Sequence, residues 1–178
     1  MRILIISNSR CGSTNLMKSI SSAYGIPSAF EPFLFNTEFD INEPLVIKTL
    51  INQNTLDFYR EFIPMFDKVI FLSRRNTIEM TESIISLVNR VKEKDYDYSL
   101  NLHLKEYEYG LDPDIDIVDT LMYKKVCARK NNIIKLSNEF NIPVDYYEDV
   151  FYGDKKLNDK DIKLDLSFLD TNLKLRKE

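Results

Sequence analysis

The sequence has no tryptophan, a single histidine and only two cysteines, Cys11 and Cys127, among 178 residues. Two cysteines provide no disulfide framework, and together with His103 they match no metal-site spacing, so we expect no metal and a reducing compartment. Four glycines and six prolines are too few for a fibrous or disordered chain. No stretch reaches the ~20 apolar residues of a membrane span, and the opening run MRILII is too short for a signal peptide. These absences predict a cytoplasmic protein.

Neither sign of charge dominates: 24 Lys and Arg stand against 28 Asp and Glu, which gives a net charge of −4. This balance argues against nucleic acid as a partner, because nucleic-acid binding requires a basic face. An anionic ligand must then be held by local groups and not by the field of the whole protein. With 44% hydrophobic residues, the chain suits one domain, residues 1–178, with a core two or three layers thick.

What the sequence does contain is a regular succession of short apolar runs and helix-like segments. Several runs are β-branched and lack polar alternation, which is typical of strands in a parallel sheet covered on both faces. The expected strands are residues 3–6, 28–30, 45–50, 68–73 and 144–147, and the expected helices are residues 14–24, 55–65, 76–92 and 115–140. Strands that alternate with helices predict an α/β fold, a three-layer, P-loop-like arrangement with a central parallel sheet flanked by helices.

Two further patterns concern the second half of this succession. The helix expected at 76–92 carries an apolar face, which predicts the side that it buries: Ile78, Ile85, Val88 and Val91. The segment at 93–114 is rich in Tyr, Asp and Lys and has no clean period, so we interpret it as a loop or lid.

In parallel α/β sheets, ligands bind beyond the carboxyl ends of the strands. Polar groups follow several of the expected strands at that edge. They are the loop at 7–14, Glu31, Lys48, Arg75 and Glu148. One edge of the sheet is therefore expected to hold one site.

The stretch SNSRCGSTN, residues 7–15, joins the first expected strand to the first helix. Backbone N–H groups at a helix N-terminus, with the helix dipole behind them, form a ready anion site. Gly12 allows the backbone to approach a ligand closely. Ser13 and Thr14 can donate hydroxyl hydrogen bonds, and Arg10 adds a fixed positive charge. A simple N-cap would need only one such residue, so we interpret the stretch as a phosphate or sulfate site.

Spacing tests which anion site this is. A nucleoside-triphosphate P-loop requires GxxxxGK[ST], but no Lys follows Gly12 and no Gly precedes it at the required distance. A small tyrosine phosphatase would close its loop with an Arg six positions after Cys11, where Met17 stands. Cys11 is therefore interpreted as a small loop filler. A flavodoxin-like FMN-binding protein also has a Ser/Thr/Asn-rich loop after its first strand, and the loop alone leaves that alternative open.

A second motif, FLSRRNTIEMTES, places Arg75 just after the strand expected at 68–73 and Ser83 about two turns into the next helix. In a straight helix the two residues lie ~12 Å apart along the axis. The long Arg side chain can nevertheless meet Ser83 around one ligand phosphate.

Together the two motifs resemble those of the sulfotransferases that use 3′-phosphoadenosine 5′-phosphosulfate (PAPS), and the double-Arg form LSRRN resembles the bacterial trehalose-type carbohydrate sulfotransferases. The resemblance implies that the loop binds the 5′-phosphosulfate and that Arg75 and Ser83 bind the 3′-phosphate. FEPF, VIKTL and YYEDV are similar to shorter family segments, so the matches span residues 2 to about 150. The chain departs from the cytosolic enzymes at Leu50, where they have a His. The implied cofactor-binding residues are Arg10, Cys11, Gly12, Ser13, Thr14, Asn15, Arg75 and Ser83.

The activity implied by this resemblance is sulfuryl transfer from PAPS to a hydroxyl of a small molecule or a carbohydrate. Arg10 and Lys48 are implied to stabilise the charge on the leaving phosphate oxygen, by analogy with phosphoryl transfer. Glu31 occupies the position of a carboxylate base, although it could also be a turn residue before Pro32. Two alternatives remain open, a flavodoxin-like FMN-binding protein and a non-catalytic module that binds PAP, the desulfated product of PAPS.

Overall fold

The structure is a computed structural model that describes residues 1–93 and 116–151, and the strands of this part form one five-stranded sheet. The strands are β1 (Arg2–Ser7), β2 (Ser28–Phe30), β3 (Leu45–Leu50), β4 (Lys68–Ser73) and β5 (Val144–Tyr146). Every pair is parallel, and the order across the sheet is β2-β3-β1-β4-β5. β2, β3 and β4 begin and end at the predicted residues. The predicted α/β class with a central parallel sheet is confirmed.

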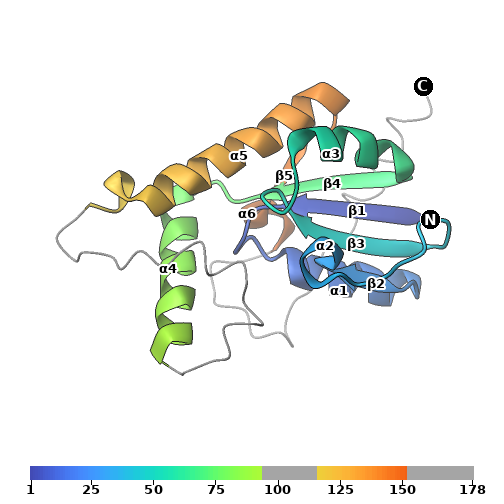
Figure 1. The fold of residues 1–178 in the computed structure, drawn as a ribbon, viewed down its shortest axis with the longest axis horizontal. Coiled ribbons are helices and arrows are strands. Elements are labelled where there is room, and N and C mark those ends of the chain that lie inside the picture. The colour runs from blue at the N-terminus through green and yellow to red at the C-terminus, as the bar shows by residue number, and fades with distance from the viewer. Residues whose placement is uncertain (94–115, 152–178) are drawn as a thin grey trace.

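Helices connect the strands and lie on both faces of the sheet (Figure 1). They are α1 (Ser13–Tyr24), α2 (Pro32–Phe35), α3 (Leu56–Phe62), α4 (Thr77–Glu93), α5 (Leu121–Phe140) and α6 (Tyr147–Val150), with 3₁₀ turns η1 (Ile63–Met65) and η3 (Ile117–Asp119). The helix predicted at 115–140 is divided at Thr120, whose hydroxyl accepts a hydrogen bond from the Tyr123 N–H as the N-cap of α5. The last strand is shorter than predicted, because the chain turns into α6 after Tyr146.

Two apolar clusters bury the two faces of the sheet and make the three layers. On one face, Leu4 and Ile6 of β1 lie in a cluster with residues of α3 and α5. On the other face, Ile3 and Ile5 lie in a cluster with residues of α1 and α6. Figure 1 shows α3 and α5 above the sheet and α1 below it. Because successive side chains of a strand point to opposite faces, one continuous apolar run supplies both cores.

Helix α4 packs on α5 beyond the end of the sheet, and the residues it buries there differ from Ile78 and Ile85 of the predicted apolar face. Met80 and Ile84 are buried against Val126 of α5, whereas Ile78 is 40% exposed and Ile85 is only half-buried. Residues four apart share one side of a helix, so the face that begins at Met80 is rotated away from the one that begins at Ile78. The side chains of 88–93, which include two of the four predicted positions, are outside the described part.

Residues 94–115 and 152–178 are also outside the described part, and with them the predicted loop or lid, except its first residue, and His103. In the described ranges, no helix combines the length and the apolar character needed to cross a membrane.

Candidate functional site

The loop between β1 and α1 changes direction at two residues with positive φ. Arg10 has a φ of 62° and Gly12 has a φ of 75°, and Gly12 is the N-cap of α1. No side chain caps this end of the helix, so the interpretation of Ser13 or Thr14 as a simple N-cap is excluded. The first amides of a helix have no partner within it, and here they lie at the carboxyl edge of the sheet. This geometry suits an anion.

Gly12 is also the point where α6 packs on the loop. A Cβ on Gly12 would lie 2.8 Å from ring carbons of Phe151 and 3.1 Å from the ring of Tyr147. These two rings stack with their centroids 4.9 Å apart. The sequence predicts close approach of a ligand at Gly12, and the structure adds a close approach of Phe151 that local sequence could not indicate.

Cys11 is part of the core and its side chain is fully buried. Its Sγ donates to the Asn8 carbonyl at 2.8 Å, and it lies in the cluster that α1 and α6 form with the sheet. Burial raises the pKa of the Cys11 thiol. The Cys11 side chain therefore fills space in the core, as its interpretation as a loop filler predicts, and a contribution of Cys11 to ligand binding stays a prediction.

Lys48 and Glu31 form a buried ion pair at this edge of the sheet. Each side chain is 3% exposed, and Lys48 Nζ donates to Glu31 Oε1. Glu31 directly follows β2, whose last residue, Phe30, pairs with Lys48 in the sheet register. The Lys48 ammonium also lies 4.7 Å from the centroid of the Phe30 ring, within cation–π range. Burial lowers the pKa of Lys48, and the Glu31 carboxylate opposes this shift.

Gln53 is a third member of this cluster, and the sequence analysis missed it. Its Nε2 donates to Glu31 Oε2 at 2.7 Å, and its Oε1 accepts from the Leu50 N–H at 3.1 Å. Gln53 lies in the turn after β3, in the polar sequence NQNT. A Gln among polar loop residues gives no signal that distinguishes it from a solvated side chain.

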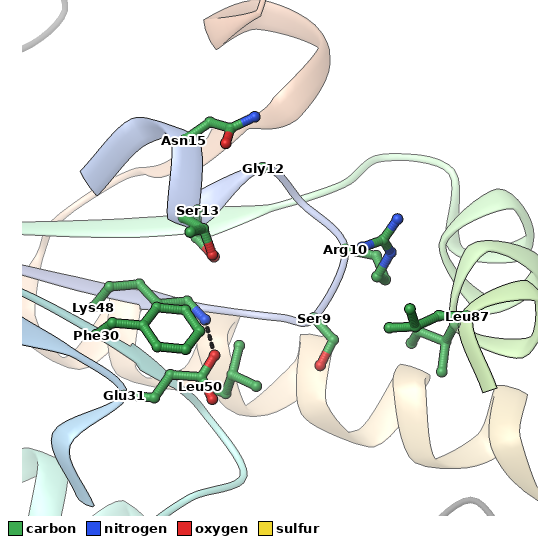
Figure 2. Close-up of a pocket in the computed structure, with 12 residues that line it drawn as sticks. Ser9, Arg10, Gly12, Ser13, Asn15, Phe30, Glu31, Lys48, Leu50 and Leu87 are labelled. Atoms are coloured by element: carbon green, nitrogen blue, oxygen red, sulfur yellow. Dashed lines mark hydrogen bonds and ion pairs between the residues drawn. The ribbon is translucent and has the colours of Figure 1, made fainter. Parts of the chain in front are cut away.

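A cavity of about 260 Å³ lies between the loop and the Lys48–Glu31 pair (Figure 2). It is lined by Ser9, Arg10, Gly12, Ser13, Thr14, Asn15, Phe30, Glu31, Lys48, Leu50, Ile84 and Leu87. Figure 2 shows the Ser13 hydroxyl directed toward Lys48. The Ser9 hydroxyl oxygen is buried and has no hydrogen-bond partner in the described part of the chain. The structure thus brings most of the predicted site residues to one cavity.

Arg10 and Ser83 meet at the side of this cavity. Arg10 Nε donates to Ser83 Oγ at 3.0 Å, which joins the loop to α4. Ser83 therefore lies beside the loop between β1 and α1, with Arg10 as a hydrogen-bond partner.

Arg75 lies instead against α6. Its guanidinium forms two hydrogen bonds to Asp149, at 2.5 and 2.6 Å, and lies 4.8 Å from the Tyr146 ring centroid. Its backbone N–H donates to the Glu148 carboxylate. The Arg75 side chain thus turns toward β5 and α6, and the meeting of Arg75 and Ser83 around one ligand phosphate stays a prediction. Neither residue lines the cavity.

Among the described residues, no group of three or more His, Cys, Asp or Glu side chains could hold a metal ion. Among these residues, the Glu31 carboxylate has Lys48 and Gln53 as its hydrogen-bond partners.

Comparison with known proteins adds little to this geometry. No family model matches the chain, and no curated protein matches it. A crystal structure of a gluconokinase from Sinorhizobium meliloti 1021 aligns with 79% of this chain and 95% of its own, at 13% sequence identity and a TM-score of 0.30. A likeness at that score is too weak to assign a function.

Proposed function

We propose that this chain is a sulfotransferase that moves the sulfuryl group of PAPS to a hydroxyl group of a small-molecule or carbohydrate acceptor. The observation that carries the proposal is that the α1 N-terminus and the buried Lys48–Glu31 pair line one cavity. The first suits an anion, and the second combines a cation with a carboxylate that can accept a proton. The loop and double-Arg motifs support PAPS as the donor.

The residues of the cavity fit the phosphosulfate end of PAPS. The α1 amides can bind its oxygen atoms, as helix N-termini bind phosphate and sulfate. Arg10 and Lys48 supply positive charge from two sides, and the buried Ser9 hydroxyl supplies a further donor. PAPS would supply the activated sulfuryl group, and the chain would supply its orientation and the compensating charge.

Glu31 and Lys48 would then have separate roles in the transfer. A bond forms between the acceptor oxygen and sulfur while the bond from sulfur to the 5′-phosphate oxygen breaks, and the acceptor proton moves to the Glu31 carboxylate. Lys48 stabilises the negative charge left on the phosphate oxygen. Since Lys48 contacts Glu31, one ion pair sets the distance between the base and the leaving group.

The 3′-phosphate remains assigned to Arg75 and Ser83. A phosphate can replace Asp149 on Arg75, because phosphate and carboxylate accept the same pair of guanidinium hydrogen bonds. Ser83 would act beside Arg10, its partner in the structure.

The strand order argues against the flavodoxin-like alternative. Flavodoxin-like sheets have the order 2-1-3-4-5, whereas β1 here lies between β3 and β4. A non-catalytic PAP-binding module differs from the proposal only in chemistry, so the experiment has to measure binding and transfer separately.

The first measurement is a thermal-shift titration with PAP, ATP and FMN, each tested on the wild-type chain and on Arg10→Ala. We expect PAP to raise the Tm, because a ligand that binds only the folded state stabilises it, and Arg10→Ala to reduce the shift. ATP and FMN should have little effect. The second measurement is transfer of labelled sulfate from PAPS to a panel of phenols and sugars. Tm shifts with FMN alone would contradict the proposal, and PAP binding without any transfer would leave only a binding module.

A further inference from the structure

Gln53 is held so that only its amide nitrogen can face Glu31. Its Oε1 accepts two hydrogen bonds, from the Leu50 N–H at 3.1 Å and from the Thr49 hydroxyl at 2.8 Å. The amide oxygen is thus occupied on the side of β3, and Nε2 is left to donate to Glu31 Oε2 at 2.7 Å. If the amide were reversed, the Leu50 N–H would face its NH₂ and the Glu31 carboxylate would face its oxygen.

Tyr59 of α3 supports this arrangement from the core. Tyr59 is fully buried, and its hydroxyl donates to the Leu50 carbonyl at 2.6 Å and lies 3.1 Å from the Thr49 hydroxyl. The contacts therefore run from the apolar core under α3 through Thr49 and Gln53 to the Glu31 carboxylate. A rigid element thereby fixes a side chain at the cavity.

Glu31 has its two carboxylate oxygens assigned to different partners. Oε1 accepts from Lys48 and Oε2 accepts from Gln53. Without Gln53, Glu31 could rotate about its side-chain torsions while it kept one contact with Lys48.

We infer that Gln53 is a positioning residue, which fixes the Glu31 carboxylate so that its Lys48-facing oxygen stays directed at the acceptor hydroxyl. This inference rests on the proposed function, because it assumes that Glu31 is the base. Gln53 does not line the cavity and does not itself touch the reacting atoms. It acts through Glu31.

The charged and titratable groups around Glu31 come from three elements. Their own titration has to be considered when the pH dependence of a Gln53 variant is interpreted. They are Lys48 on β3, Tyr59 on α3, and Arg10 and Cys11 on the loop after β1. Burial raises the pKa of Tyr59 to about 12, and burial also raises the pKa of Cys11. Lys48 is the cation in contact with Glu31.

Two substitutions separate the donor of Gln53 from its other contacts. Gln53→Glu keeps one oxygen that can accept from the Leu50 N–H and the Thr49 hydroxyl. It replaces the Nε2 donor by a second carboxyl oxygen. Gln53→Met keeps the length of the side chain and removes every hydrogen bond. Ser137→Ala is the matched control, because it deletes one side-chain hydrogen bond, to the Ile142 carbonyl, at the end of α5. That end of the helix leads into the start of β5, and so lies at the opposite edge of the sheet from the cavity.

The two variants should differ in their dependence on pH. In Gln53→Glu two carboxyl groups face each other and cannot both ionise easily, so the pair keeps one proton. Lys48 already contacts Glu31, so we expect the shared proton on the new carboxyl, where it donates as Nε2 did. We expect turnover within about fivefold of wild type at pH 6 and a further loss of at least about tenfold by pH 8.5, as the proton leaves. Gln53→Met should lose about tenfold at every pH, with PAP affinity unchanged.

Thermal unfolding tests the contact between Gln53 and Glu31 without any measurement of activity. The Tm of Gln53→Glu should fall relative to wild type as the pH rises from 6 to 8.5, because a proton bound only in the folded state is lost. If the proton leaves about one pH unit above 6, the folded state loses a factor of about ten in stability over this range, which corresponds to a Tm fall of about 3–5 °C in a chain of this size. The Tm differences of Gln53→Met and Ser137→Ala should not change with pH.

The outcomes are distinguishable. A Tm difference for Gln53→Glu that is the same at both pH values overturns the contact between Gln53 and Glu31, whatever the enzyme does. Normal turnover in Gln53→Met, in a folded variant, overturns the positioning role. Failure of PAP to bind the wild-type chain, with the pH-dependent Tm intact, overturns the proposed function and with it the positioning role, while it leaves the contact established.

Discussion

Arg10 donates a hydrogen bond of 3.0 Å to Ser83, a residue 73 positions further along the chain, and so joins the loop between β1 and α1 to α4. Arg75, which the resemblance assigns with Ser83 to one ligand phosphate, pairs with Asp149 in the structure. The two arginines therefore have partners on different helices, α4 for Arg10 and α6 for Arg75. Arg10 lines the cavity and Arg75 contacts α6.

This separation predicts different ligand preferences for the two arginines. Arg75→Ala should weaken PAP binding by ~1.5–3 kcal/mol, the range for a hydrogen bond to a charged group, and leave adenosine 5′-phosphosulfate binding unchanged, because that ligand has no 3′-phosphate. Arg10→Ala should weaken the binding of both ligands. Isothermal titration calorimetry measures both affinities. Arg60→Ala, which removes an exposed ion pair with Glu139, is the control. Equal losses for both ligands in Arg75→Ala would contradict the 3′-phosphate assignment.

The Lys48–Glu31 pair predicts strong coupling in stability. Glu31→Leu leaves the Lys48 ammonium buried without its carboxylate and should cost ~3–5 kcal/mol in the free energy of unfolding. The double variant Glu31→Leu/Lys48→Met removes the unpaired charge and should recover most of that loss. Urea unfolding of the two single variants and the double variant gives the coupling energy.

The exposed pair of Arg60 and Glu139 provides the contrast. Glu139→Ala should cost less than about 1 kcal/mol, as surface ion pairs do. For the buried pair, the double variant could instead lose as much stability as the sum of the Glu31→Leu and Lys48→Met losses. That result would show that the two side chains do not interact in solution.

Two glycines with positive φ predict unequal costs of substitution. Gly12→Ala places a methyl group 2.8 Å from the Phe151 ring at a φ of 75°, whereas Gly25→Ala, at a φ of 63°, meets nothing within 4 Å. Gly25→Ala should therefore cost only the backbone strain, ~1–2 kcal/mol. Gly12→Ala should cost a further ~1–3 kcal/mol for the overpacked contact, and thermal unfolding measures both. Phe151→Leu should recover part of the extra loss in Gly12→Ala if the ring is the cause.

Asp145 predicts a loss of stability with rising pH. Burial raises the pKa of Asp145 from 3.8 to about 6. Between these two values the folded state binds a proton that the unfolded state has released, so stability falls as the pH rises through this window. Asp145→Asn stays neutral and should be more stable than wild type by ~1–2 kcal/mol at pH 7, with no difference near pH 3.5. Urea unfolding at the two pH values tests this.

Asp67 is a control of opposite sign. Hydrogen bonds from Arg2 lower the pKa of Asp67, so its contribution is present above the unfolded pKa and is lost as the pH falls through the folded one. The loss in Asp67→Asn should thus be larger at pH 7 than at pH 3. A difference between Asp145→Asn and wild type that is independent of pH would exclude the buried-carboxyl explanation.

Short-range signals were sufficient for the strands and for most helix ends. The runs at 28–30, 45–50 and 68–73 became strands with the predicted bounds, because buried β-branched runs fit a sheet covered on both faces wherever they occur. Gly25 ended α1 as expected, in the left-handed conformation that glycine adopts easily. The carboxyl edge as the location of Glu31 and Lys48 also followed, since it depends only on all strands being parallel.

The face that α4 buries did not follow from its own periodicity. Ile78 and Met80 each begin a plausible apolar stripe, and the position of α5 selects the one that contains Met80 and Ile84. The apolar pattern of a single helix does not indicate which neighbouring element packs against it. Packing against α5 therefore decided the rotation of α4 about its axis.

By itself, then, the sequence determined the α/β class, the strands and the residues that gather at one edge of the sheet. The tertiary structure alone decided the partners: Ser83 for Arg10, Asp149 for Arg75, and Gln53 for Glu31. The physical reason is that a hydrogen bond requires heavy atoms within about 3 Å and in the correct direction. Sequence spacing places residues on elements, whereas only the packing of those elements and the φ of loop residues such as Arg10 set the direction of each side chain.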